Sequence, residues 1–253
     1  MPTASTSAAR VLIIGATSAI ATEVARLYAV RAARLCLVGR RADALAACAA
    51  DLTVRGAAAL ATECLDIDDI ARHSAVLDAA WQHFGGFDVV LVAPGVLPDQ
   101  AACEASVAAL LAGFDTNARS VIALLTELAN RCEAQHSGVI GVISSPAGER
   151  GRASNYAYGA AKAAVTSFAS GLRHRLHSRG VRVVTILPGF VDTPMTAALP
   201  KQGPLWAQAP RVAADIVRAL DRANGPLYTP WFWRWIMLIV THLPQRLFLR
   251  SKL

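Results

Sequence analysis

A serine, a tyrosine and a lysine within residues 142–162 are the side chains of this sequence best suited to acid–base chemistry. Tyr158 and Lys162 are four residues apart in an alanine-rich pattern typical of a helix, so both should project from one face. An ammonium group near a phenol favours the phenolate and lowers a pKa that is ordinarily about 10. Ser145 precedes Tyr158 by thirteen residues, with a turn between them. We expect the three side chains to act on one substrate oxygen.

The tyrosine–lysine pair can also be interpreted as an incidental pair on a helix surface, without a catalytic role. Aromatic and basic residues at this spacing are common on exposed helix faces, and Tyr156 shows that a tyrosine in this stretch can be incidental. The segments that would position the three residues must therefore be considered.

The N-terminal segment has the pattern of a nucleotide-binding unit. Residues 10–15 are typical of a buried parallel strand, residues 16–18 form a small-residue turn, and a helix is expected over 19–30. Backbone amides at the start of such a helix can bind a pyrophosphate. Gly15, Thr17, Ser18, Ala19 and Ile20 are the candidates, although alanine at positions 19 and 21 replaces the more usual glycine.

The next two strands suggest which nucleotide is bound. Residues 34–39 should form the second strand, and no acidic residue follows it to take a ribose 2′-hydroxyl. Arg40 suits a 2′-phosphate instead, which favours NADP(H) over NAD(H); a solvated loop is the alternative interpretation of Arg40. Asp66 and Ile67 follow the third strand, residues 58–64, where Asp66 could meet the adenine edge. Asp68 is expected to cap a helix that reaches about His83.

The remaining strands end in small or polar residues. A fourth strand, 87–92, is closed by Ala93, Pro94 and Gly95, and a fifth, 138–144, leads to Ser145. Asn117 lies in a helix expected around 114–130, where a buried amide commonly satisfies backbone groups. A sixth strand, 181–187, ends at the carboxyl edge of the sheet, where such folds bind ligands, with Pro188, Gly189, Val191 and Thr193.

Strands and helices alternate without an internal repeat, which predicts an α/β fold: one Rossmann-like, doubly wound parallel sheet with flanking helices. We expect a disordered tail over 1–9, an NAD(P)-binding catalytic domain over 10–230 and an apolar, basic helical extension over 231–253.

Amino-acid composition and net charge indicate which partners and which cellular compartment to expect. The net charge of +7 is spread along the 253 residues with no basic run, which argues against nucleic acid and suits an anionic ligand or membrane surface. Five scattered cysteines without metal-ligand spacing favour free thiols and no metal site. The small polar N-terminus does not have the pattern of a secretion signal, so a cytoplasmic location is expected.

Together, these segments resemble the short-chain dehydrogenase/reductase family from Val11 to about Tyr228. The resemblance implies that Tyr158 exchanges a proton with the substrate oxygen, Lys162 holds the nicotinamide ribose and lowers the pKa of the tyrosine, and Ser145 fixes the carbonyl or alcohol. Asn117 would hold a water that connects Lys162 to solvent. The implied cofactor-binding residues are Gly15, Thr17, Ser18, Ala19, Ile20, Arg40, Asp66, Ile67, Ala93, Pro94, Gly95, Asn117, Tyr158, Lys162, Pro188, Gly189, Val191 and Thr193.

Two departures from the family pattern concern the cofactor. Ala19 and Ala21 replace glycines, and Val-Ala-Pro-Gly at residues 92–95 replaces the common Asn-Asn-Ala-Gly. An alanine methyl over the pyrophosphate would weaken or reposition the nucleotide.

The C-terminal segment has a composition of its own. Residues 231–243 are nearly all apolar and include Trp231, Trp233 and Trp235; Arg246, Arg250 and Lys252 follow. Thirteen helical residues reach only about 20 Å, too short to cross about 30 Å of hydrocarbon. This composition suits a membrane interface over residues 231–252. A helix packed on the core or on a second subunit is the alternative.

This segment, with the stretches around Gly15 and Tyr158, also resembles a narrower group, the keto-reductase components of decaprenylphosphoryl-ribose 2′-epimerases. That resemblance implies reduction of a lipid-linked keto sugar phosphate, whose phosphate Arg150 and Arg152 could receive.

We therefore expect an NAD(P)H-dependent oxidoreductase that reduces a carbonyl or oxidises a secondary alcohol, and that forms a homo-oligomer. The more specific hypothesis is that the enzyme acts on the lipid-linked keto sugar phosphate at the inner face of the membrane. The alternatives are a soluble reductase of small ketones and a catalytically silent NAD(P)-binding partner subunit.

Overall fold

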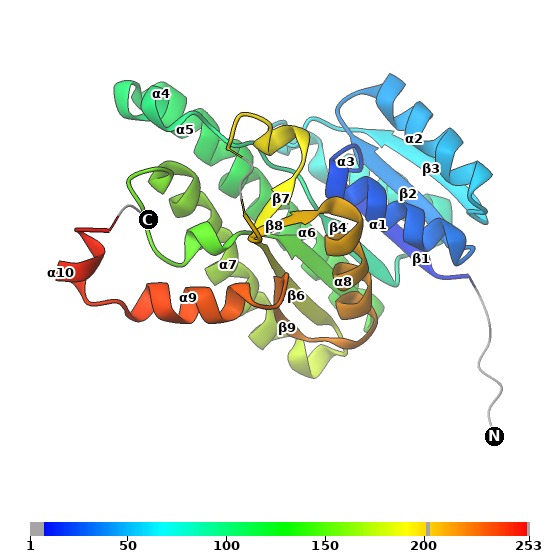
Figure 1. Ribbon diagram of the computed structural model, residues 1–253. Coiled ribbons are helices and arrows are strands. Elements are labelled where there is room, and N and C mark those ends of the chain that lie inside the picture. The colour runs from blue at the N-terminus through cyan, green and yellow to red at the C-terminus, as the bar shows by residue number, and fades with distance from the viewer. Residues whose placement is uncertain (1–7, 201–202, 252–253) are drawn as a thin grey trace.

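The computed structural model describes residues 8–200 and 203–251, and its centre is a seven-stranded sheet. All the pairings in this sheet are parallel, in the order β3-β2-β1-β4-β5-β6-β9 (Figure 1). The sheet is wholly parallel and covered on both faces, so β1 and β4 read as continuous apolar runs. The strands are β1 (Arg10–Ile14), β2 (Arg34–Gly39), β3 (Ala59–Cys64), β4 (Val89–Val92), β5 (Val139–Ile143), β6 (Arg182–Pro188) and β9 (Gly225–Thr229).

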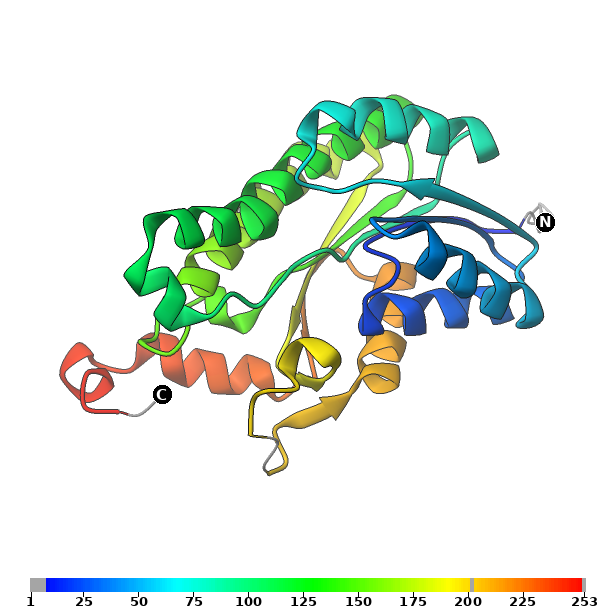
Figure 2. The same cartoon turned by 90° about the horizontal axis from the view of Figure 1, so that it is seen from above.

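Helices cover both faces of the sheet and divide its core into two clusters (Figure 2). One cluster lies under α1 (Ala19–Val30), α2 (Ala42–Val54) and α8 (Ala209–Arg222). The other lies under α3 (His73–Phe84), α6 (Ser120–Gln135) and α7 (Tyr156–Leu176). This arrangement confirms the predicted Rossmann-like α/β fold class.

The shorter elements follow the carboxyl ends of strands and so gather at one edge of the sheet. Helices α4 (Gln100–Ala105) and α5 (Val107–Phe114) come after β4, and the small sheet of β7 (Phe190–Asp192) and β8 (Trp206–Gln208) comes after β6. Helices α9 (Trp233–His242) and α10 (Gln245–Phe248) come after β9. Parallel strands place all these connections beside the site that the sequence predicts.

One predicted helix boundary is wrong. Asp68 does not cap a helix: its carboxylate accepts hydrogen bonds from Thr116 Oγ1 and Ser120 Oγ, both at 2.6 Å, and α3 begins only at His73. The predicted tail 1–9 lies outside the described residues except for residues 8 and 9. The Ala9 carbonyl accepts from the Arg34 amide at 2.8 Å, so strand pairing reaches into the predicted tail.

Within residues 8–200 and 203–251, one helical run, Val107–Gln135, is long and apolar enough to cross a membrane by length and composition. Its α6 portion buries Leu124, Leu125 and Leu128 in the core cluster beneath α3, α6 and α7. We therefore interpret the run as a helix of the core that extends past the sheet.

Candidate active site

The parallel sheet brings the predicted catalytic residues to one edge. Ser145 follows β5, Tyr158 and Lys162 lie in the first two turns of α7, and Asn117 lies in a π-helical turn, Asp115–Arg119, between α5 and α6. The Ser145 side chain lies close enough to the Tyr158 hydroxyl to lower the pKa of that phenol. The serine and the tyrosine, thirteen positions apart in sequence, are therefore in contact in space.

Lys162 is buried and makes its hydrogen bond with the backbone. Its Nζ donates to the Ile143 carbonyl at 3.1 Å and lies 5.6 Å from the centre of the Tyr158 ring. Burial penalises the ammonium and lowers the pKa of Lys162 to about 8.

The expected lowering of the Tyr158 pKa is not what this structure gives. Burial raises the pKa of Tyr158 to about 12, and the Ser145 side chain acts only partly against that rise. The phenol is therefore the stable form at neutral pH, which is the form that donates a proton during carbonyl reduction. Tyr158 remains partly exposed, whereas Lys162 beneath it is buried.

Two glycines allow the loop that carries Ser145, called here the serine loop, to pack closely on α7. A Cβ atom on Gly148 would lie 2.6 Å from the Ala163 amide nitrogen, and one on Gly159 would lie 2.7 Å from the Ala147 carbonyl oxygen. Ser145 Oγ accepts from the Ala147 amide at 3.1 Å, which fixes the turn Pro146–Gly148. The loop and the helix therefore hold Ser145 and Tyr158 in register.

Asn117 uses its amide to organise the loop after β4. Its Oδ1 accepts from the Val96 amide at 3.0 Å and its Nδ2 donates to the Gly113 carbonyl at 2.9 Å. A Cβ on Gly95 would lie 3.0 Å from that Oδ1 and 3.4 Å from Lys162 Nζ. The glycine allows the amide and the ammonium to pack against one loop, and π-turns of this kind often occur at functional sites.

The turn after β1 fits a dinucleotide phosphate. Gly15 has φ +79°, and a Cβ there would lie 2.8 Å from the Pro94 nitrogen, so only glycine lets the two loops approach so closely. Ser18 caps α1, and the amides of Ala19 and Ile20 in its first turn have no acceptor within the helix. Ala21 is fully buried in the core, so its methyl group does not lie over the pyrophosphate.

The predicted adenosine residues lie along the ends of β2 and β3. Arg40 and Asp66 are exposed, and the Asp66 carboxylate accepts from the Asp68 amide at 3.2 Å. Ile67 is buried and packs into the core, so it supports this end of the site through packing.

The loop after β6 carries the remaining candidates, and two further residues support it: Thr196, which sequence reasoning missed, and Trp233, which it placed in a segment suited to a membrane interface. Thr196 Oγ1 donates to the Val191 carbonyl at 2.6 Å and accepts from the Thr193 amide at 3.2 Å. A Cβ on Gly189 would overlap the indole of Trp233, which is buried at the start of α9. The sequence signal for Thr196 was the threonine spacing. Trp233 is buried against Gly189 and not exposed to an interface, because the contact is tertiary and no local pattern reports it.

Arg150 does not have the role suggested by the sequence. Its guanidinium donates to the Val240 carbonyl at 2.5 Å and to the Leu243 carbonyl at 2.7 Å, and its Cζ lies 3.9 Å from the centre of the Phe248 ring. These contacts at the end of α9 occupy the side chain that was expected to receive a substrate phosphate. Arg152 keeps a buried Nε without a partner in the described part of the chain.

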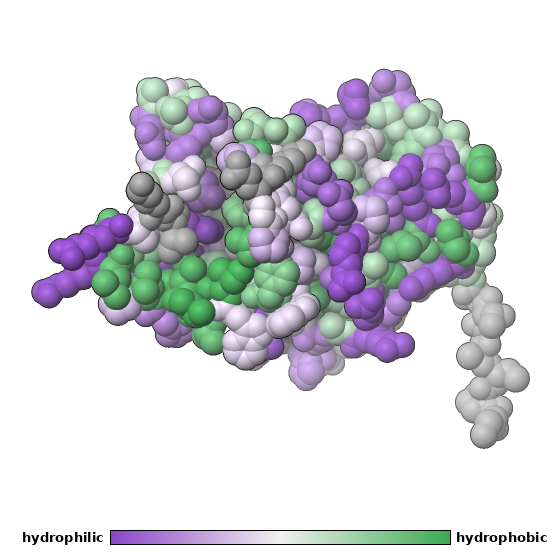
Figure 3. Space-filling model, viewed as in Figure 1, coloured by the Kyte–Doolittle hydropathy of each residue, from purple (hydrophilic) through white to green (hydrophobic). Residues whose placement is uncertain are grey.

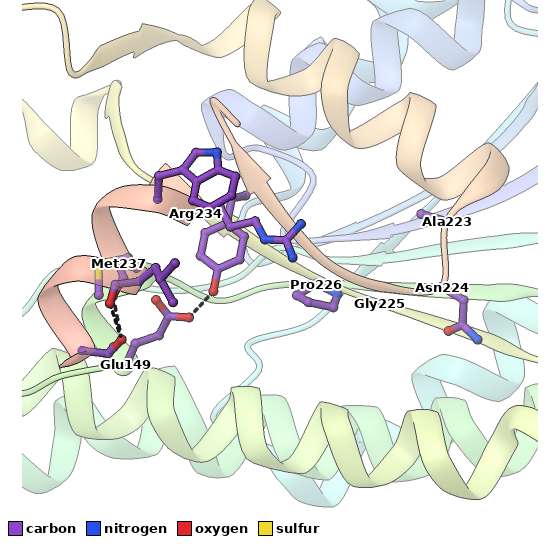
Figure 4. A pocket seen from close by; sticks show the side chains of 11 residues that line it. Glu149, Ala223, Asn224, Gly225, Pro226, Arg234 and Met237 are labelled. Atoms are coloured by element: carbon purple, nitrogen blue, oxygen red, sulfur yellow. Dashed lines mark hydrogen bonds between the residues drawn. The ribbon is translucent and has the colours of Figure 1, made fainter. Parts of the chain in front are cut away.

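A cavity of about 550 Å³ lies along β9 beneath α9 (Figure 4). Glu149 and Arg234 point toward it, and the Tyr228 hydroxyl donates to the Glu149 carboxylate. Ser145, Tyr158 and Lys162 do not line it, so this cavity is separate from the predicted catalytic group.

Comparison with known proteins gives one consistent family. The short chain dehydrogenase model matches residues 9–203. A protein described as an uncharacterized oxidoreductase of Mycobacterium tuberculosis (strain H37Rv) is 38% identical over 240 residues, which is 95% of this chain and 96% of that protein. The 3-oxoacyl-[acyl-carrier-protein] reductase of Chlamydia muridarum is 28% identical over 74% of this chain and 76% of its own length.

Solved structures share the fold. Levodione reductase superposes with a TM-score of 0.78 at 24% identity and covers 87% of this chain and 95% of its own. A short-chain type dehydrogenase/reductase from Mycobacterium marinum has a TM-score of 0.80 at 22% identity, covering 88% and 94%.

Proposed function

Because the chain belongs to the short-chain dehydrogenase/reductase family, it is an NAD(P)-dependent oxidoreductase, and we propose that it reduces a ketone with Tyr158 as the proton donor. The single observation that carries this proposal is the grouping of three side chains: Ser145 acts on the pKa of Tyr158, and the buried Lys162 Nζ lies 5.6 Å from the centre of the Tyr158 ring. The predicted catalytic residues are Asn117, Ser145, Tyr158 and Lys162.

In this mechanism, Ser145 donates a hydrogen bond to the carbonyl oxygen and holds it against the Tyr158 hydroxyl. The nicotinamide, when bound, supplies the hydride to the carbonyl carbon. Tyr158 releases its proton to the oxygen as charge develops there. Lys162 stabilises the phenolate that forms, since its ammonium lies below the ring and is held by the Ile143 carbonyl. In the reverse direction the phenolate takes the proton from a secondary alcohol.

The preferred nucleotide in this proposal is NADP(H). Arg40 is exposed at the end of β2, and no described residue ion-pairs with it. No acidic residue occupies the positions directly after β2 that would bind a ribose 2′-hydroxyl. A guanidinium there would pair with a 2′-phosphate.

For the substrate we propose a lipid-linked keto sugar phosphate. The resemblance of the C-terminal segment supports this class, as does the exposed apolar surface of α9, where Trp235 is 56% and Ile239 68% exposed. Arg152 is the remaining candidate for the sugar phosphate, because Arg150 is held by α9. A homo-oligomer at the cytoplasmic face of the membrane completes the proposal, and exposed Val107 on α5 is one candidate contact.

The test is NADPH oxidation by the purified full chain with two groups of substrate: water-soluble ketones, and a lipid-linked 2-keto sugar phosphate in detergent. We expect kcat/KM at least tenfold higher for the lipid-linked sugar. If only small ketones are reduced, the proposed substrate class is wrong. If NADPH binds and no carbonyl is consumed, the protein is a silent partner subunit instead.

A further inference from the structure

We propose that α9 and α10 dock on an anionic lipid surface and that this docking restrains both loops of the active site. The inference rests on the proposed function, which places a lipid-linked substrate at this site. It adds the residues that make the contact and the route by which lipid acts on the reaction.

One face of α9 is apolar and uncovered (Figure 3). Trp233, Met237 and Val240 point into the protein, at spacings of four and three residues. The opposite face exposes Trp235, Leu238 and Ile239, at 56%, 49% and 68%. Trp231, before the helix, and Leu247 and Leu249, in and after α10, are also exposed, at 67%, 56% and 72%. We call these six residues the docking face.

Charge selects an anionic membrane as the occupant. Residues 231–251 contain no Asp or Glu and contain Arg234, Arg246 and Arg250, all exposed. Arg234 points toward the cavity that Glu149 also lines, whereas no carboxylate pairs with Arg246 or Arg250 in the part of the chain that the structure describes. Exposed tryptophans beside unpaired guanidinium groups fit the headgroup region, where aromatic rings enter the interface and cations meet lipid phosphates.

The dimensions favour a helix lying in the interface. Helix α9 has 10 residues, so it is about 15 Å long and reaches only half of a bilayer core of about 30 Å. Its buried side is also anchored to the protein by Trp233, Met237 and Val240. The helix can therefore bury its outer face in lipid without leaving the fold.

Both ends of α9 contact a loop of the active site. At its start, the Trp233 indole packs directly on Gly189, in the loop after β6. Arg150, five residues after Ser145, binds the carbonyls of Val240 and Leu243 at the other end. Each contact is specific: Gly189 has no space for a Cβ, and the Arg150 guanidinium donates to carbonyls at a helix end that lack an N–H donor within the helix.

This arrangement gives lipid a physical route to the reaction. Immobilising α9 at a membrane restricts its two ends, and through Trp233 and Arg150 it restricts the Gly189 loop and the serine loop. Holding reacting groups in the productive geometry raises the rate. Vesicles should therefore raise kcat/KM even for a water-soluble ketone that has no lipid of its own.

Docking is tested by sedimenting the full chain with phosphatidylcholine vesicles with and without phosphatidylglycerol. We expect binding to the anionic vesicles that weakens as salt is added. The double variant Trp235→Ser/Ile239→Ser should bind about tenfold or more weakly. The matched control is Val30→Ser/Val54→Ser, which removes exposed apolar groups (71% and 90%) from α1 and α2 and should bind normally.

Coupling is tested by hydrogen exchange, which does not need turnover. Anionic vesicles should slow exchange in residues 145–153 and 189–193 of the natural protein. In Arg150→Gln, vesicle binding and protection of α9 and of residues 189–193 should persist, while the added protection of 145–153 is lost. In this variant, the ratio of kcat/KM with vesicles to kcat/KM without vesicles should also be close to one.

Each failure has its own pattern. No binding to anionic vesicles, together with an oligomer that Trp235→Ser/Ile239→Ser dissociates, would make the docking face a contact between copies and overturn the proposal. Binding without any change in exchange at the two loops would overturn the coupling. If exchange slows as expected but no ketone is reduced, the proposed function is wrong and the docking inference stands.

Discussion

Lys162 Nζ lies 5.6 Å from the centre of the Tyr158 ring and donates its hydrogen bond to the Ile143 carbonyl, 3.1 Å away, in the backbone that leads to Ser145. The lysine therefore ties the strand that carries the serine to the helix that carries the tyrosine. Burial is the largest influence on the phenol and raises the pKa of Tyr158 to about 12.

Replacing Tyr158 with Phe should lower kcat about a hundredfold or more, because the proton donor is lost while the ring is kept. NADPH affinity should change little, since the variant removes one hydroxyl. Steady-state kinetics and nicotinamide fluorescence measure the two quantities. Tyr156→Phe is the control: this side chain is 45% exposed and should be dispensable. A Tyr158→Phe enzyme with natural kcat would refute the assigned role.

The buried Lys162 predicts a rise in stability with pH. Its pKa is about 8 in the folded protein and ordinarily 10.5, so between these values the unfolded chain binds more protons and each added pH unit favours folding. The contribution between pH 8 and 10 is about 2 kcal/mol. Urea unfolding at the two pH values measures it, with Lys162→Met as the comparison. An equal pH slope in both proteins would contradict the assignment.

Arg40→Asp should reverse the nucleotide preference. The guanidinium is proposed to bind the 2′-phosphate, whereas a carboxylate repels it and can accept from a ribose 2′-hydroxyl. We expect the Kd for NADPH to rise at least about tenfold and the Kd for NADH to fall or stay constant. Arg41→Asp, the next residue, is the control for net charge. If Arg40→Asp and Arg41→Asp lose NADPH affinity equally, the loss comes from the change in net charge and not from a specific contact of Arg40.

Gly148→Ala should destabilise the protein by about 1–3 kcal/mol, because the new methyl group would meet the α7 backbone at 2.6 Å and neither loop nor helix can yield easily. Gly171→Ala in the same helix is the matched control. No atom lies within 4 Å of a Cβ there, so this change should stabilise by about 0.5–1 kcal/mol. Thermal unfolding measures the change in stability of both variants. The kcat of Gly148→Ala should also fall, because the substitution displaces Ser145.

Much of the nucleotide-binding half follows from local pattern. Residues 19–30 were predicted as a helix and form α1 with the same bounds, since the Ser18 cap and the apolar spacing are both local signals. Residues 34–39 likewise form β2. The apolar runs that end in glycine or small polar residues were sufficient to predict a parallel sheet and the edge where the candidate site lies.

The sequence did not predict the elements whose stability comes from distant contacts. Strand β9 has only a five-residue, proline-containing segment, and pairs because β6 lies beside it. Asp68 resembles a helix cap, but the hydroxyls of Thr116 and Ser120 compete for its carboxylate. Such competition depends on residues about fifty positions away.

The sequence alone determined the chemistry that is available: a phenol, an ammonium and a hydroxyl at fixed spacing, a phosphate-binding turn, and an apolar, acid-free C-terminal segment. The tertiary structure decided how these groups are used. Burial, which no local pattern reports, sets the pKa directions of Tyr158 and Lys162. Contacts of Arg150 with α9 and of Trp233 with Gly189 join the C-terminal segment to the site, because folding brings together side chains separated by ninety and forty-four residues.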